Sequence, residues 1–124
     1  MTGDRCVDYL EHMLEAAQQV QVYMADMDIA EFLADKRTQQ AVVMNLMIIG
    51  EAATKLLHDH ESFLDQFSAV PWRSMKGMRN RMVHGYFDID LAIVWDTVTT
   101  ALPELAAQLP SVLQAANERP SATK

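Results

Sequence analysis

The stretch spanning residues 72–86 holds the side chains whose types and spacing are best suited to chemistry. Arg79 is followed after four residues by His84, and Tyr86 stands two residues further along the chain. Histidine titrates near neutral pH and can accept or donate a proton, whereas arginine stays charged and can hold phosphate oxygens. The same spacing of an arginine and a histidine arises easily by chance, so the pair alone is a hypothesis about function.

The charge pattern around this pair favours the binding of an anion. The chain carries 10 Lys and Arg against 17 Asp and Glu, a net charge of −7, which excludes a uniformly basic nucleic-acid binder. Between Asp65 and Asp88, however, the sequence has no acidic residue and holds four cations and a histidine: Arg73, Lys76, Arg79, Arg81 and His84. An acidic protein with one such basic stretch can still bind an anion there.

On a helix this stretch is amphipathic, and a core face with a solvated cationic face is its simplest interpretation. One face would carry Trp72, Met75, Met78 and Met82, and the opposite face Arg73, Gly77, Asn80, Arg81 and His84. Five residues of a regular helix turn through about 140°, which places Arg79 nearer the methionines and away from His84. Two arrangements would bring these two residues together: unwinding of the helix at Gly85, or contact across a dimer interface.

A carboxylate outside the stretch is a candidate partner for its cations. Glu51 follows Gly50 in an otherwise apolar segment. It is either a surface acid or a buried partner that holds the guanidinium of a cation such as Arg79 in place.

The sequence does not predict a metal site or a cofactor. His58, His60 and Glu61 lie close together, but two histidines two residues apart point away from each other on a helix. Cys6 is the only cysteine, which excludes an intrachain disulfide and a cysteine-based zinc site. The nine methionines are interpreted as adaptable core filling and dimer contacts.

Composition predicts a single all-α domain in the cytoplasm. Half of the 124 residues are hydrophobic, helix-forming types dominate, and Gly and Pro number only four each. The N-terminus does not read as a signal peptide, and the longest apolar run, residues 46–50, is too short to cross a bilayer. We therefore expect a soluble protein without a membrane partner.

Apolar periodicity predicts an up-and-down bundle of four antiparallel helices with short extra helical turns. The helices cover residues 4–26, 37–58, 72–83 and a last segment starting near residue 91, with extra turns after Asp28 and over 63–67. Gly50 indicates close approach of a neighbouring helix. The expected boundary signals are Pro71 as first residue of the third helix, a left-handed Gly85 cap, Asp88 or Asp90 as the last N-cap, and a kink at Pro103. The domain should span residues 1–114, and residues 115–124 should form a flexible tail.

Further residues surround the pair in the order found in a known family. They are Ile49-Gly50-Glu51-Ala52, Pro71-Trp72, Arg79-Asn80, Val83-His84-Gly85-Tyr86 and Trp95. On these residues nearly the whole chain resembles the HEPN superfamily (higher eukaryotes and prokaryotes nucleotide-binding domain), specifically its HepT-like toxins. The signature of that family, Arg, four residues, His, one residue, Tyr, is matched without a gap by Arg79, His84 and Tyr86.

The resemblance implies a metal-independent ribonuclease that works as a homodimer, with the two motif-bearing helices facing each other across a cleft. His84 would take the proton of the 2′-hydroxyl of RNA, and Arg79 would stabilise the charge that builds on the phosphate. Asn80 would orient His84 or a phosphate, and three cations would guide the RNA backbone: Arg73, Lys76 and Arg81. Because the family is dimeric, contact across the interface is the preferred way to join Arg79 and His84.

The resemblance also implies a cognate nucleotidyltransferase antitoxin of the MntA type. Such a partner silences the toxin by transferring AMP to the motif tyrosine, which is Tyr86 in this sequence. The alternative is a non-catalytic helical module of the same fold that binds a nucleotide or a nucleotidyltransferase partner. A third possibility, a plain dimeric scaffold, would need neither the acid-free basic stretch nor a tyrosine after His-Gly.

Overall fold

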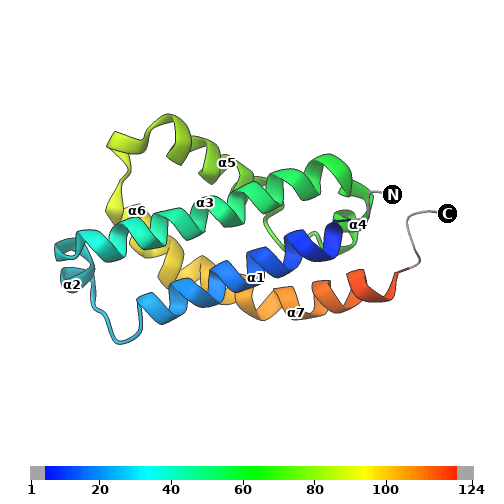
Figure 1. Cartoon of the computed structure of the whole chain (residues 1–124), viewed down its shortest axis with the longest axis horizontal. Helices are drawn as coiled ribbons and strands as arrows, with labels where there is room; N and C mark the ends of the chain where they lie inside the picture. The colour runs from blue at the N-terminus through cyan, green and yellow to red at the C-terminus, as the bar shows by residue number, and fades with distance from the viewer. Residues whose placement is uncertain (1–4, 120–124) are drawn as a thin grey trace.

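The structure, a computed structural model, describes residues 5–119 and is helical apart from short links (Figure 1). Within these residues it contains no strand, so the prediction of an all-α fold is confirmed. In chain order the elements are α1 (Cys6–Tyr23), α2 (Ile29–Ala34), α3 (Lys36–Asp59), α4 (Glu61–Leu64), η1 (Asp65–Phe67), α5 (Trp72–His84), η2 (Tyr86–Asp88), α6 (Leu91–Asp96), η3 (Thr97–Ala101) and α7 (Leu102–Glu118).

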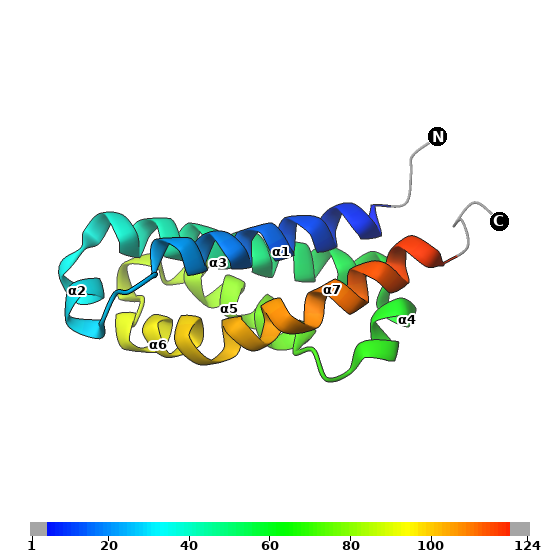
Figure 2. The same ribbon diagram turned by 90° about the horizontal axis from the view of Figure 1, so that it is seen from below.

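The long helices pack lengthwise around one apolar core. Helix α1 packs against α3 and α7, and α3 packs on its other side against α5. Figures 1 and 2 show α3 between α1 and α5, with α7 running beside α1. The largest fully buried side chains come from α1, α2, α3 and α7: Leu10, Met13, Phe32, Leu46, Ile49, Leu56 and Leu109. This packing makes α3 the platform on which the predicted motif helix, α5, lies.

Side-chain caps fix where the helices begin. Asp28 and Glu31 form a capping box at the start of α2, which is the extra turn expected after Asp28. Asp35 caps α3, and the hydrogen bonds that its carboxylate accepts from the hydroxyl and the backbone N–H of Thr38 lower the pKa of Asp35. Of the two candidates for the last helix, Asp90 is the N-cap of α6.

The two ends of α5 differ from the prediction in detail. Pro71 is the N-cap residue instead of the first helical residue, and α5 begins at Trp72. Gly85 has φ −131°, so it is not a left-handed cap. Its N–H donates to the carbonyl of Arg81 and its own carbonyl accepts from the N–H of Asp88. The chain therefore continues into the 3-10 turn η2 without the reversal that a left-handed residue would produce.

The last helical segment is continuous but changes its winding. Residues Thr97–Ala101 form a π-helical stretch between α6 and α7, and Pro103 lies in the first turn of α7. A proline has no N–H to donate and its ring crowds the carbonyl four residues earlier, here that of Thr99. The structure thus has π-helical winding just before Pro103, and the predicted kink stays a prediction.

The predicted tail boundary at residue 115 is wrong. Helix α7 continues to Glu118, because Ala116 extends the buried stripe of Leu105, Leu109 and Val112 and is itself only 4% exposed. The guanidinium of Arg119 then lies over the ring of Phe63, 5.3 Å from its centroid. Residues 120–124, the rest of the predicted tail, lie outside the described residues.

Within the described chain, α3 is the one helix long and apolar enough to cross a membrane by length and composition. The central helix of a soluble bundle meets the same criteria, and eight residues of α3 are buried in the core.

Candidate functional site

The site is built where α5 crosses α3 at Gly50. A β-carbon placed on Gly50 would lie 2.3 Å from Cβ of Arg79 and 2.8 Å from the carbonyl oxygen of Met75. Both distances are shorter than any van der Waals contact, so only glycine allows the two helices to approach this closely. The close approach predicted from Gly50 is confirmed, and the residue it admits is Arg79.

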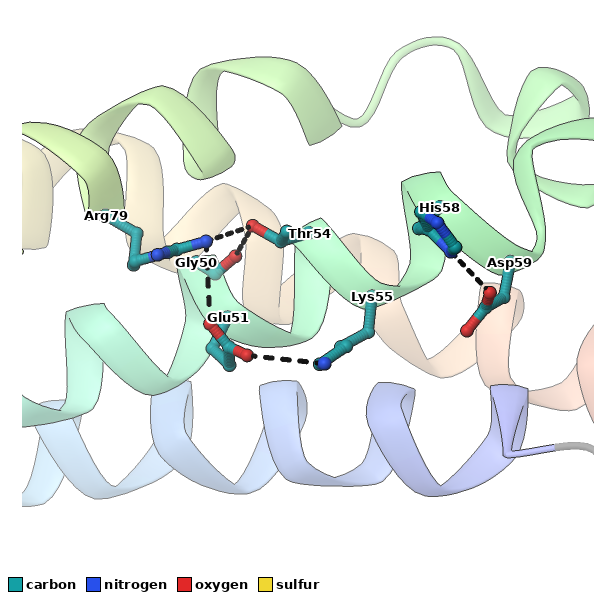
Figure 3. A network of polar contacts seen from close by, with 7 residues as sticks. All are labelled: Gly50, Glu51, Thr54, Lys55, His58, Asp59 and Arg79. Atoms are coloured by element: carbon teal, nitrogen blue, oxygen red, sulfur yellow. Dashed lines mark hydrogen bonds and ion pairs between the residues drawn. The ribbon is translucent and has the colours of Figure 1, made fainter.

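The guanidinium of Arg79 lies along α3 and is held there by two side chains (Figure 3). Its Nη2 donates to Oγ1 of Thr54 at 3.2 Å and lies 3.6 Å from Oε1 of Glu51. The side chain is 23% exposed. Its Nε is buried and has no hydrogen-bond partner, and no partner within residues 5–119 engages Nη1. Arg79 is therefore a half-buried cation fixed by one terminal nitrogen.

Glu51 lies beside Arg79, as the second interpretation expects, but its side chain is exposed, as the first expects. Its side chain is 52% exposed, and its second carboxylate oxygen lies 3.9 Å from Nζ of Lys55. An exposed carboxylate shared between two cations contributes little stability, because water screens both attractions. Glu51 therefore lies beside the guanidinium but contributes little to fixing its orientation.

His84 is the last residue of α5, and its side chain is exposed. It makes no hydrogen bond or ion pair with any residue of the described chain. The helix is regular through His84 and changes only at Gly85, so the first predicted arrangement, unwinding that swings His84 round, is not seen. Arg79 and His84 remain about 140° apart around the helix axis. One copy of the chain does not bring the two together.

Tyr86 and Phe87 follow on the short turn η2. Tyr86 is 47% exposed and Phe87 is 97% exposed, and their rings stand edge to face with centroids 5.9 Å apart. The Tyr86 side chain is therefore accessible to a modifying partner, as the predicted role requires. Phe87 carried no signal in the sequence, because nothing in the spacing distinguishes an exposed phenylalanine from a buried one.

The three predicted RNA-guiding cations lie along α5 in different surroundings. Arg73 forms an ion pair with Glu61 of α4, at the end of α5 far from His84. Lys76 is exposed and makes no ion pair within the described chain. Arg81 borders an apolar pocket on the other side of His84 from Arg79. Asn80 is half-buried and lies between Arg79 and His84 around the helix axis. The structure therefore pairs Arg73 with an acid and leaves Lys76 and Arg81 exposed.

That pocket lies between α5 and the continuous α6–η3–α7 segment and was not predicted. Its volume is about 490 Å³, and it is walled mainly by apolar side chains, among them Leu46, Ile49, Met75, Met78, Met82, Ile93, Val94, Leu102 and Leu105. Helix α5 thus packs closely against α3 on one side and borders this pocket on the other.

The described chain gathers no three His, Cys, Asp or Glu side chains that could hold a metal ion. Nδ1 of His58 lies 2.6 Å from a carboxylate oxygen of its neighbour Asp59, and this hydrogen bond lowers the pKa of Asp59. The histidines near residue 60 thus belong to a polar helix end.

Comparison with known proteins identifies a family. The family described as "HepT-like: Ribonuclease HepT-like" matches residues 13–112. The "Probable ribonuclease HepT" of Thermococcus cleftensis is 37% identical over 79% of this chain and 86% of its own length. "Putative RNase MJ0127" of Methanocaldococcus jannaschii is 34% identical over 86% of this chain and 85% of its own length. No solved structure matches the chain significantly.

Proposed function

The chain belongs to the HepT-like ribonuclease family, and we propose that it is an endonuclease that cleaves RNA without a metal, using Arg79 and His84. The observation that carries the proposal is the position of Arg79. A half-buried cation, fixed by Nη2 and free at Nη1, lies on the same helix that ends at an exposed histidine. These are the two groups that phosphodiester cleavage by proton transfer and charge stabilisation needs.

In the proposed reaction the neutral ring of His84 takes the proton of a 2′-hydroxyl. The oxygen attacks the adjacent phosphorus, and the bond from phosphorus to the 5′-oxygen of the next nucleotide breaks. The leaving oxygen takes a proton from the imidazolium or from water, and the products are a 2′,3′-cyclic phosphate and a 5′-hydroxyl. Nη1 of Arg79 stabilises the charge on the non-bridging oxygens in the transition state.

The other polar residues of α5 support binding. Asn80 lies between Arg79 and His84 around the helix and orients the imidazole or a phosphate oxygen. Lys76 is exposed and guides the RNA backbone, and Arg81 extends the positive surface beyond His84. Arg73 can bind the RNA backbone only after its ion pair with Glu61 breaks.

We further propose that the active form is a homodimer in which Arg79 of one copy works with His84 of the other. The outer face of α3 and α5 supports this proposal. Met44 and Ile48 lie on the same side of α3 as Glu51 and are 58% and 39% exposed, and Val83, one turn beyond Arg79, is 48% exposed. Exposed apolar side chains beside a fixed cation form a self-complementary surface for two-fold association. Two-fold pairing through this surface would place the two α5 helices opposite each other. Arg79 of one copy would then lie near His84 of the other.

Mixing two inactive variants tests the shared site. Arg79→Ala and His84→Ala copies, allowed to exchange subunits, should regain about one quarter of wild-type cleavage. Half of the dimers formed at random are mixed, and each mixed dimer has one site with both residues intact. Differently tagged copies confirm exchange, and two tagged forms of Arg79→Ala, mixed in the same way, should stay inactive. A mixture that exchanges subunits and stays inactive would place both residues of a site in one chain.

The proposed biological setting is a cytoplasmic toxin–antitoxin pair whose antitoxin is a nucleotidyltransferase of the MntA type. The phenolic oxygen of Tyr86 attacks the α-phosphorus of ATP, pyrophosphate leaves, and the phenolic proton passes to solvent. Each AMP places a negative phosphodiester and a bulky nucleoside two residues from His84. Inhibition is then both steric and electrostatic, because the added phosphate occupies the positive surface that RNA needs.

Replacing Tyr86 by Phe should abolish this modification without unfolding the protein. The change keeps the ring, which stacks edge to face on Phe87, and removes only the exposed hydroxyl. Intact-mass measurement after incubation with the partner and ATP should show AMP on the wild type and none on Tyr86→Phe. The matched control is Tyr23→Phe, which removes the hydroxyl of a tyrosine 38% exposed on α1 and should be modified like wild type. Equal modification of Tyr86→Phe would place the acceptor elsewhere.

A further inference from the structure

Within residues 5–119, Thr54 is the one neutral group that holds the guanidinium of Arg79. Its Oγ1 accepts a hydrogen bond from Nη2 of Arg79 at 3.2 Å and donates one to the carbonyl oxygen of Gly50 at 2.8 Å (Figure 3). The hydroxyl proton is committed to the carbonyl, so a lone pair of the oxygen faces the arginine. The result is a directed chain of hydrogen bonds from Arg79 through Thr54 to the backbone of α3, in which each bond polarises the next.

The side chain of Arg79 lies against three residues on one turn of α3, which are Gly50, Glu51 and Thr54. Gly50 provides the space for the β-carbon of Arg79, and its carbonyl anchors the hydroxyl of Thr54. Glu51 supplies charge, but at 3.6 Å, from an exposed side chain, and while also lying near Lys55. Thr54 is half-buried and β-branched, so its hydroxyl has few rotamers to choose from. The directional contact therefore comes from Thr54 and not from Glu51.

We propose that Thr54 is a positioning residue that aims Arg79 at the scissile phosphate. This inference rests on the proposed ribonuclease function and adds a residue to it. With Nη2 held by Thr54 and Nε buried, the plane of the guanidinium is set and Nη1 is the nitrogen left to meet a phosphate oxygen. Without the hydroxyl, the long side chain keeps its charge but samples other rotamers, so fewer molecules hold it in the reactive geometry.

The test compares Thr54→Val and Thr54→Ser with wild type in RNA cleavage. Valine keeps the shape and removes the hydroxyl, and we expect kcat to fall about tenfold with KM within twofold of wild type, because the aim of Arg79 matters most in the transition state. Serine restores the hydroxyl and should recover most of kcat. A role in packing alone would give the reverse pattern, since serine lacks the methyl group that valine retains.

Thr99→Val is the matched control. The hydroxyl of Thr99 also donates to the carbonyl four residues earlier at 2.8 Å, but it is exposed and no arginine donates to it. Thr99→Val should keep kcat at the wild-type value, and only Thr54→Val should lose kcat. Thr54→Val with wild-type kcat, beside an inactive Arg79→Ala, would overturn the positioning role. Cleavage by Arg79→Ala at the wild-type rate would instead overturn the proposed function.

Discussion

Replacing His84 by Ala is expected to lower RNA cleavage at least about 100-fold and leave the fold intact. A positioned acid or base contributes a factor of about 100 to 10,000 to rate, and alanine cannot transfer a proton. His84 is exposed at the end of α5 and makes no hydrogen bond within residues 5–119, so the free energy of unfolding should change by no more than about 0.5 kcal/mol. Cleavage of labelled RNA and urea unfolding measure the two effects separately.

The matched control for this variant is His12→Ala. His12 is an exposed histidine on α1, away from α5, and its loss should leave cleavage at the wild-type rate. A folded His84→Ala protein that cleaves RNA as fast as His12→Ala would remove His84 from the mechanism.

Replacing Gly50 by Ala is expected to damage both the fold and the activity. The new methyl group would meet Cβ of Arg79 and the backbone oxygen of Met75, neither of which can rotate away, so α5 must shift. Overpacking of this kind costs about 1–3 kcal/mol, which outweighs the roughly 1 kcal/mol that alanine gains over glycine in a helix. Because the shift carries Arg79 with it, cleavage should fall about 100-fold. Urea unfolding and the cleavage rate of the folded fraction measure the two losses.

Gly77→Ala provides the comparison on the other helix. A β-carbon there would meet only the mobile Nη1 of Arg81 at 3.4 Å, so the change should be neutral or stabilising through helix propensity. If Gly50→Ala were as stable as Gly77→Ala, α3 and α5 would not be packed as closely as the structure has them.

Much of the fold could be predicted because its helices carry their own signals. Apolar residues at helical spacing located α1, α3 and α5 within a few residues, and Asp28 marked the start of α2. The errors lie where a boundary depends on tertiary contacts. Ala116 extends α7 because it packs into the core, and the residue type alanine alone gives no sign of that. The residue type of Gly85 predicts a left-handed cap, but the 3-10 turn that follows needs another conformation.

The candidate site was predictable only in part. Arg79, His84 and Tyr86 could be found because they share one short segment, and Gly50 indicated a close approach of helices. Thr54 could not, because its contact with Arg79 joins residues 25 positions apart and depends on the register between α3 and α5. The pairing of Arg73 with Glu61 was missed for the same reason, since it depends on how α4 folds back toward α5. Local patterns identify reactive residue types, whereas their partners come from packing between helices.

The chemistry of the RNA products formed in excess chelator tests the proposed mechanism most directly. Wild-type protein should cleave RNA without divalent ions and leave 2′,3′-cyclic phosphate and 5′-hydroxyl ends. A matched oligonucleotide with one 2′-deoxy sugar at the mapped cleavage site should resist cleavage there, because the attacking oxygen is missing. Cleavage that requires a divalent ion, or that proceeds at the deoxy position, would contradict a mechanism in which His84 activates the 2′-hydroxyl and Arg79 stabilises the phosphate.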